Sequence, residues 1–538
     1  MSRNLQVSSL LQQFIASINR GETRQEPLQE KEDLTARRSA ISLERQTFQP
    51  YVSAVPRKSE YTLNAPPEFL AHVMPPVWVY EGEAYDLTDF IKKHPGGGFF
   101  IGRMRNRDIT VLLNVMHRNP DKVKKLLQKY SLHRKATPND IHPLCFGVPS
   151  FLFQAGFDSW RDTPKFDFQT PGKLIDNIRE RLQESEIQAL IARMDVWFDV
   201  VTAVLGIAYI LIQVLQLSAV AFMPVFLFVP LMVMLRICLS GAGHYLSHRS
   251  QRGLTPLLTH VFDVNYLLMA YLLVDGHTIL HHGWSLSKVD PKPSSFTAIM
   301  ELPRCYRIPC YTLHKFGNLF IGMILRFLQI CHYGYQYGIA SIYGSRQNGL
   351  PHYIGGVCAR VLLCAEFFLF AFSGNLMVWV AQFVITIWLT TFMIFAGHNF
   401  DREIGEITAE DESDWAIFQI KNACDLSITG NKYIDCFLSA GLSPHRVHHV
   451  LPYQRSGFAN IASEAIVREE AEKLGVAWLP PRNFFLDSLP KLIRRYLFTP
   501  SRQAKEQCYG LLLEHFHPQA LYTSIEFIFK GFIGIGAL

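Results

Sequence analysis

Two long stretches of the chain contain no Asp, Glu, Lys or Arg, at residues 200–235 and 367–400. A helix needs about 20 mostly apolar residues to cross a membrane once, so each stretch is long enough for two crossings. Residues 213–218 make the middle of the first stretch more polar, and Ser-Gly-Asn at 373–375 is a turn signal in the second. The sequence therefore predicts two helical hairpins, with about four transmembrane helices in all.

Two hairpins return the chain to the side of the membrane from which it came. We therefore expect the polar parts of the chain, including both termini, on one side. Lys and Arg accumulate on the cytoplasmic side of membranes, and the exit residues of the first hairpin are Arg236, His248, Arg249 and Arg252. This predicts a multi-pass integral membrane protein with cytosolic termini, in the endoplasmic reticulum of a eukaryote or the inner membrane of a bacterium.

Three weaker apolar stretches, at 257–274, 316–343 and 522–538, each contain charged residues. We expect the first two at the membrane interface or packed on the rest of the protein rather than across the bilayer. The third predicts a peripheral amphipathic helix.

The composition of the 538-residue chain is that of a protein with both soluble and membrane parts. Apolar residues make up 49% of it, yet the mean hydropathy is only +0.10, which is low for a wholly embedded chain. The net charge is +6 and no long Lys/Arg run exists, which argues against a nucleic-acid partner. The ten cysteines form no CxxC pair and are typical of reduced thiols facing the cytosol. Residues 1–65 are polar and do not have the pattern of a signal peptide.

Residues 66–134 have the pattern of a small α+β module with two prominent histidines. His94 begins a His-Pro-Gly-Gly sequence, and His117 follows on a later segment. Two histidines on facing segments can fill both axial positions of a low-spin haem, which then passes electrons without binding O2. Glycines after His94 let the backbone approach a porphyrin closely. The side chains expected to form the apolar pocket are Leu112, Leu113, Val115, Leu126 and Leu127.

This module resembles the cytochrome b5 family through the run Tyr-Asp-Leu-Thr-Asp-Phe-Ile-Lys-Lys-His-Pro-Gly-Gly and a second histidine at the expected distance. The resemblance implies haem b with His94 and His117 as its axial ligands. One position departs from the family pattern, because the glycine of the family's GxDxT sequence is replaced in Asn106-Arg107-Asp108. We expect this departure to alter the packing of the loop and not the ligation.

Nine further histidines lie in four clusters, and each of the first three clusters is near the end of an apolar segment. Residues four apart on a helix lie on nearly the same face, so an HxxxH pair can face one metal. Nine imidazoles exceed the three or four ligands that zinc, the rival metal, commonly takes, and imidazole also suits iron. The pattern predicts a centre of two non-haem irons near the membrane surface. Its ligands would be His244, His248, His277, His281, His282, His398, His445, His448 and His449.

The order of clusters and crossings resembles the membrane fatty acid desaturase family over residues 195–464. Asp290 after the second cluster, Trp415–Gln419 after His398, and Leu451 after the last cluster extend the likeness beyond the histidines. With the module in front, the chain resembles front-end acyl desaturases and their sphingolipid relatives. The resemblance implies a multidomain protein with an α+β cytochrome b5-like domain before an all-α membrane desaturase domain. The expected borders are 1–65 for the polar segment, 66–134 for the haem domain, 135–194 for a linker, 195–500 for the membrane domain and 501–538 for the tail.

Two features depart from the front-end pattern. The third box generally begins with Gln, and here that position is His445. The second cluster is one residue longer than the usual HxxHH, so His277, His281 and His282 would span about 140° of an ideal helix. Either the helix is distorted there or His277 binds differently.

The resemblance also implies a reaction cycle. An NADH-dependent cytochrome b5 reductase or a similar donor reduces the haem, which passes electrons singly to the irons. The irons then use O2 as co-substrate to remove two hydrogens from a lipid acyl chain. Two alternatives remain: a lipid hydroxylase on the same scaffold, with an alcohol product, and a non-catalytic haem-bearing membrane electron carrier without the iron pair. Desaturation is favoured because most members of the family perform it.

Overall fold

The computed structural model describes residues 76–105, 107–137, 140, 166–218, 222–263, 277–279, 281–286, 290, 298–322, 346–398, 413–501 and 513–533. The predicted polar segment 1–65 lies outside these ranges. So do residues 264–274 and 323–343, which form most of two weaker apolar stretches, and the end of the tail.

The N-terminal domain is a small α+β unit, as predicted. Its four-stranded sheet has the order β3-β1-β2-β4, with β1 antiparallel to β2 and parallel to β3. The β1–β2 turn is tight because Glu81 and Gly82 both have positive φ, 49° and 77°. The strands are β1 (Trp78–Tyr80), β2 (Glu83–Tyr85), β3 (Arg107–Asp108) and β4 (Ser131–Lys135), and the helices are η4 (Ile91–Lys93), α4 (Gly98–Arg103), α5 (Thr110–Met116), α6 (Pro120–Leu127) and η5 (Gln128–Tyr130).

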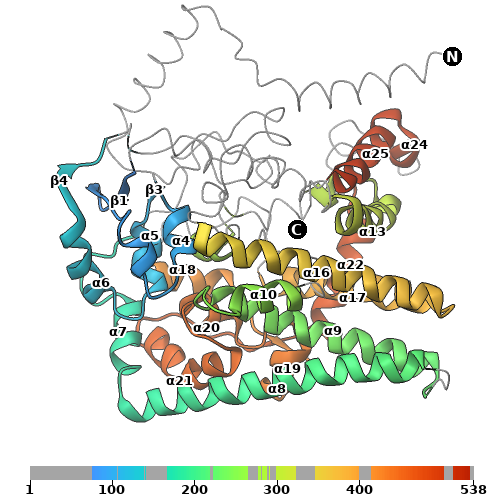
Figure 1. Ribbon diagram of the computed structural model, residues 1–538, viewed down its shortest axis with the longest axis horizontal. Coiled ribbons are helices and arrows are strands. Elements are labelled where there is room, and N and C mark those ends of the chain that lie inside the picture. The colour runs from blue at the N-terminus through green and yellow to red at the C-terminus, as the bar shows by residue number, and fades with distance from the viewer. Residues whose placement is uncertain are drawn as a thin grey trace, which may run out of the picture.

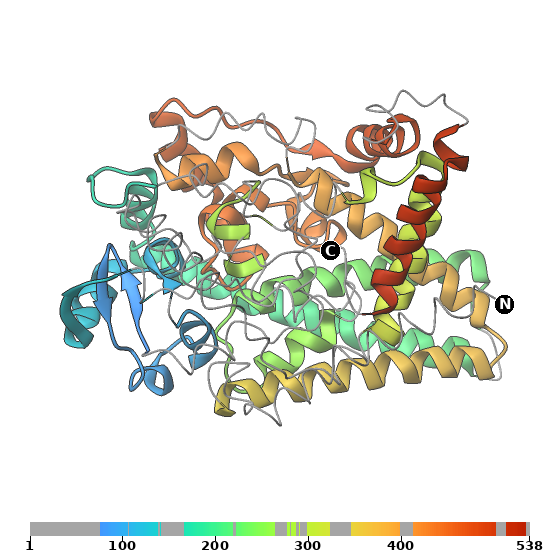
Figure 2. The ribbon, with the colours of Figure 1, turned by 90° about the horizontal axis from the view of Figure 1, so that it is seen from above.

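Four helices of the described chain are long and apolar enough to cross a membrane, and they form two hairpins, as predicted. The third span, Ile354–Phe372, includes Arg360 and Glu366 and lies mostly before residue 367, so the prediction that residues 367–400 hold two crossings was wrong. The first hairpin is α8 (Ser185–Leu217) with α9 (Val225–His248). The second is α16 (Arg346–Phe372), whose candidate span starts at Ile354, with α17 (Leu376–Ala396). Figures 1 and 2 show the hairpins extending away from the N-terminal domain.

Arg236 lies in the middle of α9 and is completely buried, so the prediction that it marks the exit of the first hairpin was wrong. Its guanidinium pairs with the carboxylate of Glu366 on α16. The same carboxylate accepts hydrogen bonds from the Tyr209 hydroxyl on α8, at 3.0 Å, and from the Trp379 indole on α17, at 3.1 Å. All four spans therefore meet at one buried ion pair, which allows a charge inside an apolar segment.

Shorter helices gather at the end of the bundle nearest the N-terminal domain and along its side. Asp414 and Asn431 cap two of them by accepting hydrogen bonds from the first-turn amides. The remaining elements are α7 (Leu174–Arg181), α10 (Thr255–Asp263), η11 (Arg304–Tyr306), α13 (Arg307–Gly317), η12 (Asn318–Gly322), α18 (Trp415–Asn422), β5 (Leu426–Ser427), α19 (Lys432–Leu438), α20 (His445–Val450), α21 (Gly457–Lys473), β6 (Arg482–Asn483), η14 (Phe484–Ser488), α22 (Leu489–Phe498), α24 (Leu513–Phe516) and α25 (Pro518–Phe532).

The α13 helix and the C-terminal helix α25 form a pair beside α17. In η12, which directly follows α13, the Phe320 ring packs on the Trp379 ring of α17, with ring centroids 6.0 Å apart. His314 of α13 donates from Nδ1 to the Phe527 carbonyl of α25 at 2.7 Å. The opposite face of α25 exposes Tyr522 and Ile525, so the described part of the tail is an amphipathic helix.

The N-terminal domain is docked on the membrane domain through the segments that carry its two histidines. In the turn after His94, the Gly96 carbonyl accepts a hydrogen bond from the backbone amide of Gln251 at 3.2 Å. The His94 carbonyl accepts a hydrogen bond from the Arg252 guanidinium. Gly97 has φ +89°, and a Cβ there would lie 3.0 Å from the Gln251 carbonyl oxygen. This position therefore requires glycine for its backbone conformation and for the domain contact.

The helix before His117 makes the second contact between the domains. Arg179 of α7 donates to the Asn114 carbonyl of α5 at 2.6 Å. Val111 of α5 faces Gly283. A Cβ added to Gly283 would lie 4.0 Å from a methyl carbon of Val111. Val115 belongs to one buried cluster with residues from α7, α18 and α20. The two domains therefore share a hydrophobic core at this contact.

Candidate haem site and metal centre

His94 and His117 face each other inside the N-terminal domain. Their ring centroids are 6.0 Å apart. The Nδ1 of His94 donates to the Gly97 carbonyl at 2.7 Å, and that of His117 donates to the Leu113 carbonyl at 2.9 Å. With a metal–nitrogen bond of about 2 Å, this spacing leaves room for one metal between the two Nε2 atoms.

The surroundings of the two rings also fit a haem. Burial lowers the pKa of His94 and brings that of His117 to about 4, so both are neutral at pH 7 and can act as ligands. Of the apolar residues predicted around the haem, Leu113 and Leu127 are buried and Leu112 and Leu126 are half-buried, whereas Val115 packs against α7, α18 and α20 instead. A Cβ on Gly96 would lie 2.9 Å from the His94 ring, so this glycine is needed for the position of the ring itself.

Five histidines from three clusters converge in a first metal-binding group. One nitrogen of each lies within 4.8 Å of one nitrogen of every other. The Nε2 of His277 lies 2.7 Å from that of His244, 3.0 Å from that of His248 and 3.1 Å from that of His282. The fifth member, His448, has its Nε2 3.1 Å from that of His244. These five side chains come from α9, the segment 277–282 and α20.

Hydrogen bonding among the rings cannot account for the contacts of His277. A ring nitrogen carries either one proton or one lone pair, and the Nε2 of His277 meets three other Nε2 atoms. Ligands at right angles around a metal with bonds of about 2.1 Å would lie about 3 Å apart, which matches these separations. The donor set and its spacing therefore fit one metal ion.

A second group lies beside the first. His281, His398 and His449 bring one nitrogen each within 4.8 Å of the others. The Nε2 of His445 lies 3.2 Å from that of His449, and its ring centroid lies 4.6 Å from that of His398. The rings of His282 and His449 are 4.5 Å apart and connect the two groups. All nine predicted histidines are thus brought together, and all but the half-exposed His248 are buried.

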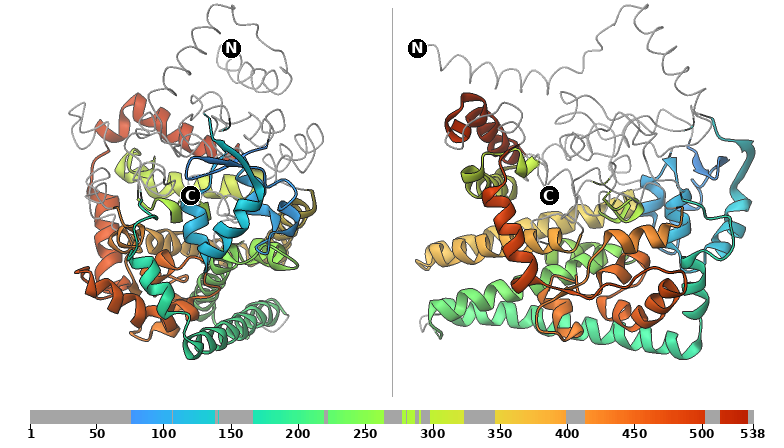
Figure 3. Two further views of the ribbon diagram at one scale, coloured as in Figure 1. Left: turned by 90° about the vertical axis from the view of Figure 1, so that its left-hand side faces the viewer. Right: turned by 180° about the vertical axis from the view of Figure 1, so that it is seen from behind.

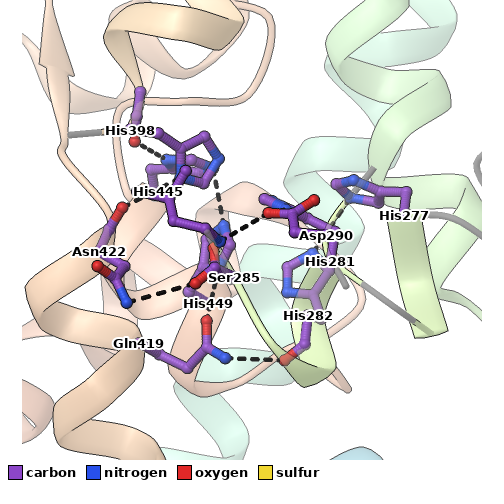
Figure 4. A network of polar contacts seen from close by, with 12 residues as sticks. His277, His281, His282, Ser285, Asp290, His398, Gln419, Asn422, His445 and His449 are labelled. Atoms are coloured by element: carbon purple, nitrogen blue, oxygen red, sulfur yellow. Dashed lines mark hydrogen bonds and ion pairs between the residues drawn. The ribbon is translucent and has the colours of Figure 1, made fainter. Parts of the chain in front are cut away.

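Each ring of the second group donates a hydrogen bond from Nδ1 to an oxygen, which directs its Nε2 to the site. Figure 4 shows these contacts. The acceptors are Asp290 for His281 at 2.8 Å, Gln419 for His449 at 2.8 Å, the Asn422 carbonyl for His398 at 3.1 Å and the Gly397 carbonyl for His445 at 2.7 Å.

The helix that carries the second cluster is distorted, which was one of the two predicted explanations for its extra residue. Residues 277–279 and 281 are π-helical. Hydrogen bonds in a π-helix join residues five apart instead of four, so the wider turn brings His277 and His282 onto one face. His281 points to the second group instead.

The ring nitrogens of the site are held in their neutral state. Burial lowers the pKa of His282 and of His449 well below the usual value, and the surrounding imidazoles lower both further. Neutral imidazole is the form that binds metals, so the site is ready for a cation at neutral pH.

Sequence patterns identified the ligand candidates better than the residues that support them. Asp290 and Gln419 lie in stretches that contribute to the family resemblance, but no role was predicted for either. Gln419 also donates to the His282 carbonyl at 2.9 Å and so joins α18 to the first group. The carbonyl of Asn422 could not be predicted, because every residue offers the same backbone group.

The variant Asp290→Asn should weaken metal binding at the second group. The substitution removes the negative charge of the Asp290 carboxylate, which orients the His281 ring. The same carboxylate accepts a hydrogen bond from the Leu286 backbone amide at 2.7 Å. Loss of such a partner costs about 10–100-fold in metal affinity. Chelator competition measures this loss, with Asp487→Asn, at a half-exposed site that pairs with Lys491, as control. Equal chelator resistance in both variants would contradict the supporting role of Asp290.

Comparison with known proteins gives two family matches. The model of the fatty acid desaturase family matches residues 166–480, and that of the cytochrome b5-like haem/steroid binding domain matches residues 70–134. The chain is also similar to the probable Delta(5) fatty acid desaturase C of Dictyostelium discoideum. The two are 22% identical over 409 residues, covering 70% of this chain and 82% of the relative. No solved structure matches the chain.

Proposed function

Because the chain belongs to the fatty acid desaturase family and carries a cytochrome b5-like domain, we propose that it is an O2-dependent, di-iron lipid desaturase with an internal electron relay. Forming one double bond removes two hydrogens from the acyl chain. O2 is reduced to two waters when two further electrons and two protons are supplied. The single observation that carries this proposal is the convergence of nine imidazoles in two adjoining groups.

The first group would hold one iron and the second group, with His445, the other. When bound, the iron pair supplies the activation of O2. The chain's own residues hold the ligands and exclude water, since the site lies under buried side chains. Gln419 bonds both the His449 ring and the His282 carbonyl, and so fixes the two groups relative to each other.

Haem b between His94 and His117 would receive electrons from an external donor, such as an NADH-dependent reductase. The docking of the domains supports an onward route to the metal groups. The His94 turn bonds to Gln251 and Arg252, which closely follow His248. Val111, on the helix that leads to His117, faces Gly283, the residue after His282. Each haem-ligand segment therefore meets residues just after a metal-ligand cluster.

We place the protein across a membrane with the polar domains on the cytosolic side. Both hairpin turns lie at the end of the bundle away from the N-terminal domain (Figure 1), and α8 exposes Val204, Ile207 and Leu211 as a lipid-facing side would. The lipid acyl chain would reach the site from the bilayer. The same proposal assigns residues 66–134 to the haem domain and residues 195–500 to the membrane domain.

Expression in a host that lacks the product tests this function. We expect new unsaturated acyl chains by mass spectrometry with the native protein and none with His448→Ala. An alcohol product would identify a hydroxylase instead. Unchanged lipids, with a normal haem spectrum and no non-haem iron, would identify an electron carrier.

The variant His94→Ala should lose the low-spin haem spectrum and all turnover driven by a protein donor. The variant removes one of two axial ligands but leaves the distant metal groups intact, so non-haem iron should stay at the native level. His133→Ala, on the exposed strand β4, is the control. A preserved low-spin spectrum in His94→Ala would show that the haem ligand was assigned incorrectly.

A further inference from the structure

The surface around the haem-ligand segments is strongly basic. Residues 76–137 contain twelve Lys and Arg but only six Asp and Glu. Six exposed side chains form what we call the lysine face. Within the described ranges none of the six makes an ion pair. The lysine face consists of Lys92, Lys93, Arg118, Lys122, Lys125 and Lys129.

The lysine face borders both haem ligands. Lys93 precedes His94, and Arg118 follows His117. Phe90 contacts the His94 ring on one side, with centroids 5.8 Å apart, and Tyr130 on the other at 5.3 Å. These contacts join the Lys92–Lys93 segment to η5, which carries Lys129. The lysine face therefore places positive charge next to both predicted haem ligands.

Acidic groups do little to neutralise this face. Asp108 is the one acid between His94 and His117, and it accepts from the Thr110 amide inside the fold. Asp121 pairs with Lys124, which is not part of the face. Asp89 is exposed and has no ion pair among the described residues, and Asp176 of α7 lies near Lys124 and pairs with Arg179. The face therefore keeps a strong positive potential.

The lysine face has two parts. Lys93 and Arg118 adjoin segments that contact the membrane domain, whereas Lys122 and Lys125 lie on α6. Gly97 and Asn114 contact residues of the membrane domain directly. In Figure 1, α6 lies at the end of the molecule opposite to the hairpin turns, and Figure 3 (left) views this end. Lys122, Lys125 and Lys129 are exposed there, so a soluble partner can reach them.

We propose that the lysine face docks an electron-transfer protein with an acidic surface. The proposal rests on the haem relay proposed above and adds the chemistry of its donor. Each encounter would oxidise the donor by one electron and reduce the haem-loaded domain by one, with no proton transferred. Opposite charges steer such encounters and raise association rates about tenfold or more at low salt. The attraction is screened over about 10 Å at 0.1 M salt.

Anaerobic stopped-flow reduction of the haem in the full-length protein tests the proposal. The protein is held in nanodiscs of neutral phosphatidylcholine, and the probes are reduced acidic [2Fe–2S] ferredoxin and the cationic methyl viologen radical. We expect Lys122→Glu/Lys125→Glu to slow reduction by ferredoxin about tenfold at low salt and to speed reduction by methyl viologen. Both changes should shrink as salt is raised. Lys122→Gln/Lys125→Gln should show a smaller effect of the same sign.

Arg193→Glu/Arg468→Glu is the control, because it makes the same change in charge at exposed sites on α8 and α21. It should leave both rates unchanged. Equal rates in native protein and the Lys122/Lys125 variants, or an equal loss in the control, would overturn the proposal. A loss of ferredoxin reduction only when the nanodiscs contain phosphatidylserine would assign the face to anionic lipid instead. Failure of the native protein to show a low-spin haem spectrum would overturn the relay as well as the docking.

Discussion

The variant His277→Ala should lose its non-haem iron and nearly all desaturation while it keeps the haem spectrum. His277 is the central member of the first group, since its Nε2 contacts those of His244, His248 and His282. The loss of activity should exceed the roughly 100-fold that removal of a supporting residue can cost. Iron analysis, product analysis and the visible spectrum of one preparation measure all three properties.

A buried histidine outside the metal groups provides the matched control. His314 bonds to the Phe527 carbonyl between α13 and α25, and His314→Gln should keep its non-haem iron. Full activity and iron in His277→Ala would mean that the second cluster contributes only His281 and His282. If His448→Ala and His449→Ala also kept iron and activity, the di-iron proposal would be wrong.

The variant Glu366→Leu should destabilise the membrane domain by about 3–5 kcal/mol, because it leaves the buried Arg236 without its counter-ion. It also removes the acceptor of the Tyr209 and Trp379 hydrogen bonds. The double variant Arg236→Met/Glu366→Leu should recover most of the loss, since no uncompensated charge remains. Thermal unfolding in one detergent, compared across the three proteins, measures both effects.

An exposed ion pair serves as the reference for this experiment. Glu526 and Lys530 lie 2.8 Å apart on α25, one helical turn from each other. Glu526→Leu should cost no more than about 0.5 kcal/mol. A single variant Glu366→Leu as stable as the native protein would show that the buried pair is not needed. A double variant as unstable as the single one would show that packing, and not charge, causes the loss.

The hairpins and the convergence of the nine histidines could be predicted because both depend on local patterns. Absence of charge over 34 or more residues leaves few structures other than spans, and histidines at the ends of those spans meet once the spans pack together. The division into two groups could not be predicted. It depends on the π-helical turn that sends His277 and His282 to one group and His281 to the other.

The mistaken and the missing assignments have a shared physical reason. Arg236 was assigned to the membrane surface because a charge ordinarily ends a span, but its partner Glu366 is 130 residues away in sequence. The partners of Asp290 and Gln419 are likewise set by tertiary packing. Local composition contains no information on such distant pairs, whereas it does determine where a helix can cross a membrane.

The buried pair that joins the two hairpins also affects how the protein is made. Arg236 enters the membrane with the first hairpin, and 130 further residues must be added before Glu366 is present. At about 5–20 residues per second, synthesis of that stretch takes on the order of ten seconds. During that time the first hairpin holds an uncompensated charge in or beside the bilayer. The first hairpin must therefore remain in the insertion machinery or near the surface until the second hairpin arrives, so the four spans complete their assembly together.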